Sequence, residues 1–179
     1  MKGEGRAAKD EGAPMVFIAL GSNLGDSPAT VRRALRRLEA LSVAPLLRSS
    51  LWQSSPVDCP PGSPPFVNAV AGLAPQPGET PETLLTKLQA LEREFGRRPR
   101  QVRNEPRPLD LDLLAFGAET RATPALTLPH PRAHQRRFVL APLAEIAPDL
   151  ALPGQLRSVA DLLAALRSDE VLCRLPGAG

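Results

Sequence analysis

Two aspartates separated by a single residue are the feature of this sequence best suited to chemistry. They lie in the segment PRPLDLDLLAFG (106–117), where leucines alternate with Asp110 and Asp112. In a β-strand, residues two positions apart project from one face, so the two Cα atoms would lie roughly 6.5–7 Å apart with the leucines opposite. Carboxylates at this spacing can share one or two divalent cations, and Mg²⁺ prefers one or two carboxylates together with phosphate oxygens and water. The alternative is an amphipathic strand whose solvent face carries two acids.

Arginine is concentrated beside this aspartate pair. Residues 92–107 contain six arginines and three glutamates, an excess equal to the formal net charge of +3 for the whole chain. Such a segment suits a polyanionic partner, either a phosphate-bearing small molecule or a nucleic acid. The chain has five Phe, one Trp and no Tyr, which leaves little for base stacking and favours the small molecule. The alternative is a solvated arginine-rich loop.

A second basic segment, LPHPRAHQRRFVL (128–140), contains both histidines of the chain. His130 and His134 are four residues apart, but Pro131 lies between them and no metal-binding glutamate accompanies them, so the zinc-protease pattern is not matched. A histidine and several arginines near a carboxylate pair fit phosphate contacts better. A surface or capping role is the alternative for each histidine, and it is the better interpretation of His134.

The sequence lacks the usual glycine-rich nucleotide loops. It contains no G-x-x-x-x-G-K-[ST] and no G-x-G-x-x-G, and it also lacks G-x-S-x-G and a cysteine–histidine nucleophile pattern. Phosphoryl transfer on this chain would therefore depend on Mg²⁺ and arginines, with the in-line positioning of the substrates supplying most of the catalysis.

The elements that must position these groups predict an α+β fold. Apolar runs predict strands at 15–20, 46–57, 66–73 and 109–116, and helical spacing predicts helices that begin at Ser27–Pro28 and Thr80–Pro81, each an N-cap followed by a first helical residue. The order is β-α-β-β-α-β, which is the ferredoxin-like sandwich: a mostly antiparallel sheet with two helices on one face and the other face free for ligands. A helical C-terminal extension, with helices near 142–147 and 158–166, is expected to follow.

Composition limits the class of protein. With 179 residues, 42% hydrophobic and 23% charged, the chain is expected to form a single globular domain over 14–179 behind a disordered leader at 1–13. No apolar run approaches the ~20 residues of a membrane-spanning helix. Two cysteines are too few for a disulfide framework, so a cytoplasmic location is predicted. The proline-rich segment 55–65 is expected to be a long mobile loop.

Taken together, the motifs resemble the 6-hydroxymethyl-7,8-dihydropterin pyrophosphokinase family of folate biosynthesis. PR-x-LDLDLL is highly specific to this family, and GSNLGD and LPHPR-x-H-x-R-x-FVL support it. Six blocks follow the family's order: ALGSNLGD (19–26), SSLWQSSPV (49–57), FVNAV (66–70), LQALEREFGR (88–97), PRPLDLDLLAFG (106–117) and LPHPRAHQRRFVLAPLAEIAPDL (128–150).

The resemblance implies transfer of a diphosphoryl group from ATP to the hydroxymethyl oxygen of the pterin, giving AMP and the pterin methyl diphosphate. It also implies a ferredoxin-like fold, two Mg²⁺, and mobile loops that close over both substrates. ATP and 6-hydroxymethyl-7,8-dihydropterin are then the expected partners, without nucleic acid or membrane. Nothing in the sequence requires more than a monomer.

Site residues carry over from the family by position. Asp110 and Asp112 would hold the two metals, Arg107 would join them as a catalytic residue, and Asp110 is the one candidate general base. The ATP-binding set is Gln89, Glu92, Arg97, Arg98, Arg100, Arg107, Leu113, Thr127, His130 and Arg136. The pterin-binding set is Ser54, Ser55, Val57, Phe66, Asn68 and Phe138.

The sequence departs from the family's pattern mainly in the loop before the aspartates. Asn104 replaces a Trp found in some members, Pro99 stands where an arginine is frequent, and Glu105 occupies a position where many relatives carry Gly. Ala125 likewise replaces a frequent arginine. These departures concern the loop contacts rather than the aspartate pair.

Two other classes of function fit parts of the sequence. A ferredoxin-like RNA-binding module would suit the basic segment, but it would need aromatic residues in an RNP-type run, which the sequence lacks. A metal-dependent phosphohydrolase or nuclease could use the same aspartate pair, and it would act without a pterin.

Overall fold

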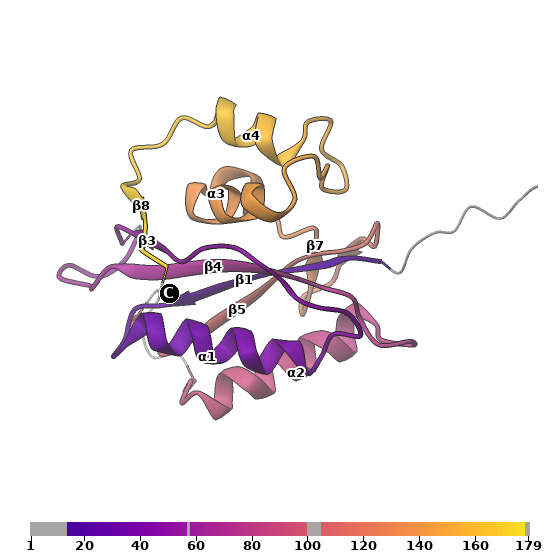
Figure 1. The fold of residues 1–179 in the computed structure, drawn as a ribbon, viewed down its shortest axis with the longest axis horizontal. Helices are drawn as coiled ribbons and strands as arrows, with labels where there is room; N and C mark the ends of the chain where they lie inside the picture. The colour runs from indigo at the N-terminus through magenta and orange to yellow at the C-terminus, as the bar shows by residue number, and fades with distance from the viewer. Residues whose placement is uncertain (1–13, 57, 100–104, 178–179) are drawn as a thin grey trace, which may run out of the picture.

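A central antiparallel sheet with helices on both faces forms the framework of the protein (Figure 1). The structure, a computed structural model, describes residues 14–56, 58–99 and 105–177. Its elements are β1 (Val16–Ser22), α1 (Ser27–Glu39), β2 (Leu47–Arg48), β3 (Trp52–Ser54), β4 (Phe66–Leu73), α2 (Pro81–Glu94), β5 (Asp110–Phe116), β6 (Arg121–Ala122), β7 (Thr127–Leu128), a short 3₁₀ helix η1 (Ala133–Gln135), α3 (Arg137–Ile146), α4 (Val159–Ala165) and β8 (Leu172–Arg174).

The strands are ordered β5-β1-β4-β3-β8, with β2 also paired to β4. The α+β class predicted from the sequence is confirmed, and the strand at 66–73 has the predicted bounds. The single strand predicted at 46–57 is wrong, because the chain forms two short strands there. Ser49, between them, turns its hydroxyl into the sheet and accepts the backbone N–H of Val70 at 2.9 Å.

The starts of the two long helices differ in how they are capped. At α2 the prediction is confirmed: Thr80 is the N-cap, its hydroxyl accepts the N–H of Thr83, and the Thr83 side chain accepts the N–H of Thr80 in return. At α1 the predicted N-cap is wrong, because Asp26 caps the helix by accepting the Ala29 N–H at 3.1 Å. Ser27 is already helical, and its hydroxyl accepts a hydrogen bond from Ser22 instead.

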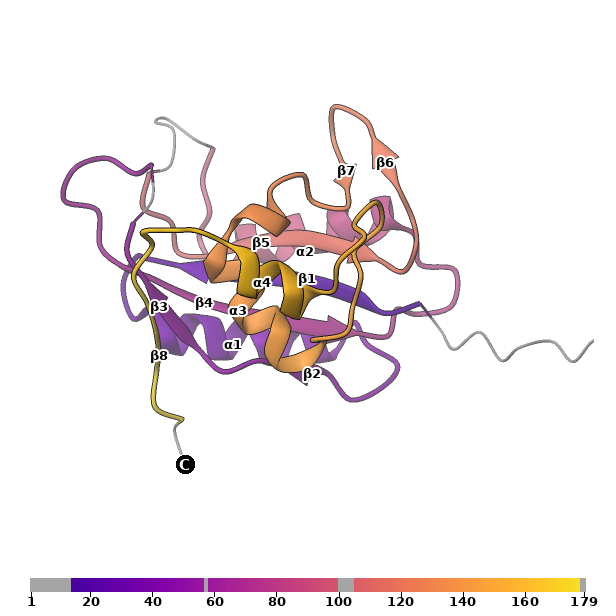
Figure 2. The same cartoon turned by 90° about the horizontal axis from the view of Figure 1, so that it is seen from above.

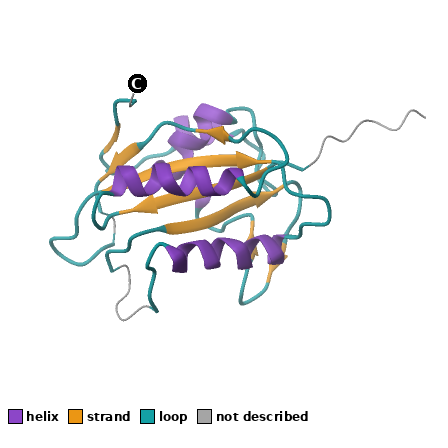
Figure 3. Cartoon of the chain, turned by 60° about the horizontal axis from the view of Figure 1, so that its bottom comes forward, coloured by secondary structure: helices purple, strands orange, loops and turns teal. Residues whose placement is uncertain are grey.

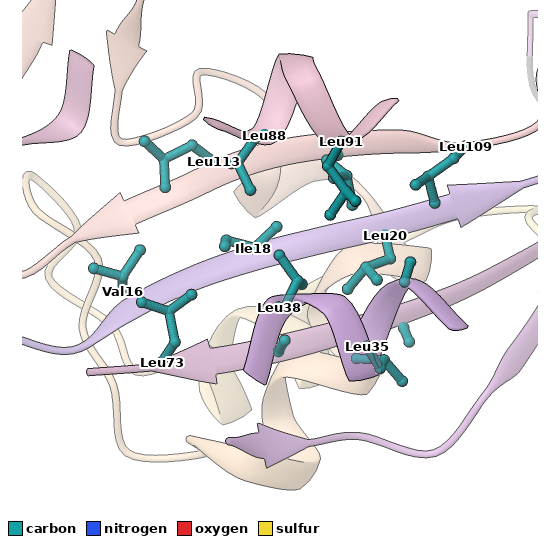
Figure 4. Close-up of a cluster of buried hydrophobic side chains, with 14 of the residues drawn as sticks. Val16, Ile18, Leu20, Leu35, Leu38, Leu73, Leu88, Leu91, Leu109 and Leu113 are labelled. Carbon is teal, nitrogen blue, oxygen red and sulfur yellow. The ribbon is translucent and has the colours of Figure 1, made fainter. Parts of the chain in front are cut away.

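One face of the sheet, here called the α1/α2 face, is closed by two parallel-lying helices (Figure 3). Alternate residues of the strands point into this layer and are almost fully buried. Figure 4 shows them interleaved with leucines of α1 and α2 in one apolar cluster. The labelled members are Val16, Ile18, Leu20, Leu35, Leu38, Leu73, Leu88, Leu91, Leu109 and Leu113.

The opposite face, here called the α3 face, is covered over only part of its area (Figures 1 and 2). The prediction of a free second face is therefore wrong, because α3 and α4 bury a second apolar cluster against Phe17, Val70 and Leu114 of the strands. The helix predicted at 142–147 begins earlier, at Arg137, and α4 lies within the predicted 158–166.

The C-terminal extension is not wholly helical. After α4 the chain returns to the sheet, where β8 pairs antiparallel with β3 in the register Trp52↔Arg174. The predicted leader at 1–13 lies outside the described residues. Within the residues that the structure describes, no helix is both long enough and apolar enough to cross a membrane.

Candidate active site

A cavity of about 770 Å³ opens on the uncovered part of the α3 face, beside the start of α3. Strand alternation supplies its floor, because the residues opposite the buried leucines point this way. The side chains that line it include Asn68 of β4 and Asp110 and Asp112 of β5. The remaining walls come mainly from residues 54–56 and 58–59, from the stretch between His130 and Phe138, and from residues 168–170.

The two aspartates of the floor have different surroundings. One carboxylate oxygen of Asp110 pairs with Arg97 at 2.8 Å and with Arg107 at 3.1 Å. Asp112 has no ion pair this close among the described residues. Burial, and then the negative charge of Asp110, raise the pKa of Asp112 to about 6, while Arg136 and Arg107 act in the opposite direction. Asp112 is therefore a buried carboxylate beside a second carboxylate, and a cation bound there would favour its charged form.

Behind Asp110 lies a buried carboxylate that does not line the cavity. Glu92 of α2 accepts the backbone N–H of Leu111 at 2.7 Å and pairs with Arg97. Burial raises the pKa of Glu92 to about 7, although the Leu111 N–H and Arg97 both favour its charged form. Glu92 thus fastens α2 to β5 and holds Arg97 against Asp110.

The opposite wall is basic. The backbone N–H of His130 donates to the Leu114 carbonyl at 2.9 Å, and its Nδ1 accepts the N–H of Arg132 at 3.2 Å. Burial and the charges of Arg136 and Arg132 lower the pKa of His130 to about 4, so its ring is neutral at pH 7. With Nδ1 occupied as an acceptor, Nε2 carries the proton and is free to act as a donor. Arg136 stacks over the Phe138 ring at 5.4 Å.

The other end of the cavity combines an amide with aromatic rings. Asn68 is almost fully buried, and its amide nitrogen donates to the Ser54 hydroxyl at 2.8 Å. Phe66 and Phe138 line the same cavity from β4 and α3. The arrangement suits a flat heterocycle with polar edges. Of the predicted pterin-binding residues, Val57 lies outside the described part of the chain.

A second, smaller hollow of about 280 Å³ adjoins the first. Asp112 and His130 line both, so these two residues lie where the hollows meet. Leu113 and Thr127, two residues predicted to bind ATP, lie in the second hollow. An elongated ligand could therefore pass from one hollow to the other beside the Asp112 carboxylate.

Not every predicted residue reaches these hollows. Gln89 and Arg98 are exposed and line neither, and Arg100 lies outside the described residues, as does Asn104. Ala125 lines the second hollow.

Three residues that line the main cavity, Arg132, Gln135 and Glu170, were not predicted from the sequence. Nor was Asn23, whose side-chain oxygen accepts the Arg107 N–H at 2.9 Å. The only signal for Asn23 was its position in GSNLGD, which indicates a turn rather than a contact with a segment 84 positions away.

Comparisons with known proteins agree on one class, the pterin pyrophosphokinases. Residues 17–148 match the family model described as 7,8-dihydro-6-hydroxymethylpterin-pyrophosphokinase (HPPK). The chain belongs to this family.

Curated bacterial relatives named 2-amino-4-hydroxy-6-hydroxymethyldihydropteridine pyrophosphokinase are similar over most of their length. The protein of Pseudomonas aeruginosa is 44% identical over 91% of this chain and 98% of its own. That of Haemophilus influenzae is 43% identical over 77% and 84%, and that of Bacillus subtilis 39% over 74% and 77%.

Solved structures agree on the fold. A Plasmodium falciparum HPPK-DHPS structure with SDX-DHP superposes with a TM-score of 0.69 at 11% identity, over 88% of this chain. The chain spans less than half of that protein, 45%, and at this identity the likeness concerns the fold alone.

Proposed function

We propose that this chain transfers a diphosphoryl group from ATP to the hydroxymethyl oxygen of 6-hydroxymethyl-7,8-dihydropterin, giving AMP and (7,8-dihydropterin-6-yl)methyl diphosphate in folate biosynthesis. Membership of the HPPK family supports this activity. The observation that carries it is the position of Asp110 and Asp112, which lie in one cavity between basic side chains and an amide–aromatic pocket.

The basic wall is the proposed site of the ATP phosphates. Arg107 and Arg136 would neutralise phosphate oxygens, and the neutral His130 would donate from Nε2. The nucleoside would extend into the second hollow, beside Leu113 and Thr127. Glu92 and Arg97 would act from behind Asp110, and the roles of Gln89, Arg98 and Arg100 stay predictions.

The amide–aromatic end is the proposed pterin pocket. Asn68 would bond a polar edge of the ring, with Ser54 holding its amide in place. Phe66 and Phe138 would cover the apolar surface of the ring, and Ser55 would complete the wall. The role of Val57 stays a prediction.

The donor set fits magnesium bound together with a nucleotide. Among the described residues, no cluster of three or more His, Cys, Asp or Glu could hold a metal ion. The protein can therefore offer Asp110 and Asp112, and the remaining ligands would be phosphate oxygens and water, which is the set that Mg²⁺ prefers beside ATP. When bound, the two Mg²⁺ that the family resemblance implies would offset phosphate charge and polarise the reacting oxygens.

The residues of the chain contribute alignment and charge neutralisation. The alcohol oxygen forms a bond to the β-phosphorus while the bond from that phosphorus to the oxygen shared with the α-phosphate breaks, and AMP leaves. Asp110 is the predicted acceptor of the alcohol proton. Its carboxylate is already paired with two guanidinium groups, Arg97 and Arg107. Most of the rate would therefore come from holding the two substrates in line.

Finer features of the architecture are also proposals. The strand order β5-β1-β4-β3, joined by α1 and α2, supports the ferredoxin-like arrangement. The small number of cysteines, two in the whole chain, supports a reducing compartment such as the cytoplasm. A single domain over 14–179 and a monomeric state stay predictions.

Product analysis by chromatography tests the function. The protein is mixed with ATP, Mg²⁺ and the reduced hydroxymethyl pterin, and AMP is expected only when the pterin is present, with its formation abolished by a chelator. ADP with a pterin monophosphate would indicate an ordinary kinase. Phosphate release or nucleic-acid cleavage without pterin would indicate a hydrolase.

A further inference from the structure

The C-terminal strap, residues 168–174, lines one side of the main cavity with residues 168–170 and ends in β8. Its residue Glu170 points to the start of α3, where Oε2 accepts the backbone N–H of Arg137 at 3.1 Å. The residue before α3, Arg136, makes no side-chain cap of its own. A carboxylate 33 positions away in sequence therefore serves as the cap of this helix.

This cap lies between two proposed substrate contacts. Arg136 precedes the capped N–H and Phe138 follows it, and both side chains line the cavity. The N–H of Phe138 also faces the Glu170 carboxylate and favours its charged form. The orientation of the first turn of α3 sets where the Phe138 ring lies, so a contact that fixes this turn fixes the ring.

The same strap holds the facing wall of the pocket. Val171 donates its N–H to the Ser55 hydroxyl at 3.3 Å, and its carbonyl accepts the Ser55 N–H at 3.0 Å. Ser55 belongs to the predicted pterin-binding set. Two consecutive residues of the strap thus reach two walls of one pocket, Glu170 through its side chain and Val171 through its backbone.

The half-buried position of the Glu170 carboxylate costs free energy. Burial raises its pKa, and among the described residues its Oε1 is the buried side-chain oxygen or nitrogen atom without a hydrogen-bond partner. A purely surface strap would gain nothing from a half-buried acid. We propose that Glu170 is a positioning residue for pterin binding, which acts by capping α3 and fixing Phe138 opposite Ser55. The inference rests on the proposed function.

Substitution of Glu170 tests this role through the two substrates separately. Glu170→Ala is expected to raise the KM and the dissociation constant for the pterin about tenfold, in line with the loss of one helix cap. The KM for ATP should not rise, because Arg107 and His130 still hold the phosphates and the backbone of Arg136 is also bonded to η1. The negative charge that is removed acts on the Arg136 guanidinium, so its loss favours phosphate binding. Glu170→Gln keeps an oxygen acceptor for the Arg137 N–H and should restore most of the pterin affinity.

Ser158→Ala is the matched control, because Ser158 caps α4 by accepting the Asp161 N–H at 3.2 Å and does not line the cavity. It should lower the melting temperature as Glu170→Ala does and leave both KM values unchanged. A folded Glu170→Ala with wild-type pterin affinity overturns the proposal, as does an equal rise in both KM values or a pterin defect in Ser158→Ala. If the wild type binds no pterin, the proposed function fails and the role of Glu170 fails with it. Normal wild-type turnover with an unchanged Glu170→Ala overturns the role alone.

Discussion

The two faces of the sheet are made by the same three strands and yet differ in how far they are covered. On the α1/α2 face, alternate residues of β1, β4 and β5 are mostly apolar and are buried under two helices, with the polar Ser22 at the end of β1 as an exception. On the α3 face, Phe17, Val70 and Leu114 lie under α3 and α4, whereas Asn68, Asp110 and Asp112 face the cavity. Along β5, residues that stabilise the core therefore alternate with residues that line the proposed active site.

The difference shows how a small sheet can support a polar site. The α1/α2 face provides burial that does not depend on the cavity, so the α3 face can hold two close carboxylates whose repulsion costs stability. Substitutions on the two faces should accordingly affect different measurements.

Asp112→Ala should give the largest effect on chemistry. Turnover is expected to fall by about 10²–10³-fold or more, because one of two carboxylates that would hold the cations is lost. The melting temperature should stay the same or rise, since a buried charge beside Asp110 is removed. Steady-state kinetics and thermal unfolding measure the two effects, with the exposed Asp149→Ala as the control. A wild-type rate would remove Asp112 from the mechanism.

Leu109→Ala, at the residue before β5, should give the opposite pattern: a large loss of stability and a small loss of turnover. Leu109 is fully buried on the α1/α2 face, so its truncation should lower the free energy of unfolding by about 2–5 kcal/mol. Denaturant unfolding measures this loss. The turnover of the molecules that stay folded should fall far less than in Asp112→Ala. If the two variants lost turnover equally, the separation of the two faces would not hold.

Asn68→Ala should weaken one substrate. The KM for the pterin is expected to rise about tenfold, the value of a lost hydrogen-bonding partner in a dry pocket, with little change in the KM for ATP. Ser49→Ala is a fair control, because Ser49 is also buried and polar and bonds Val70 of the same strand outside the cavity. Equal loss of both affinities would place Asn68 elsewhere.

Glu92→Gln should act on stability, where its effect is visible as a pH dependence. Because burial raises the pKa of Glu92 from 4.5 to about 7, the folded protein binds this proton more tightly than the unfolded chain. Wild-type stability should therefore fall relative to the Gln variant as pH rises from about 4.5 to 7, by up to about 3 kcal/mol.

Unfolding of both proteins at matched pH values isolates this difference from the other groups that titrate there. Asp112 titrates in the same range, and His130, with its lowered pKa, has the opposite sign. Arg97 and Asp110, which face Glu92, are unchanged in both proteins. A constant difference across pH would mean that Glu92 is already ionised throughout.

The parts of the fold that follow from local pattern were predictable. The period-two alternation around Asp110 and Asp112 placed both carboxylates on one face, and Thr80–Pro81 marked the start of α2. The start of α3 was missed because Pro142, inside the helix, looks like a boundary. What holds the earlier turns is burial of Val139 and Leu140 against the sheet.

The parts of the site that were missed depend on contacts between distant segments. The contact of Glu170 with the start of α3 and that of Asn23 with Arg107 cannot be predicted from the residues near each of them in the sequence. Single acids and amides are common on surfaces, and only the folded chain shows which of them become partners. The β8 strand was missed for a related reason, because three residues are too few for a periodic signal.

The central position of β1 has a consequence for synthesis on the ribosome. Its first residue, Val16, pairs with Leu73 of β4 and with Phe116 of β5. About 100 further residues must therefore be synthesised after β1 before its second neighbouring strand exists. At ordinary rates of translation this interval lasts about 5–20 s. During that time one edge of β1 is unpaired, and the strand that covers this edge is also the one that brings Asp110 and Asp112.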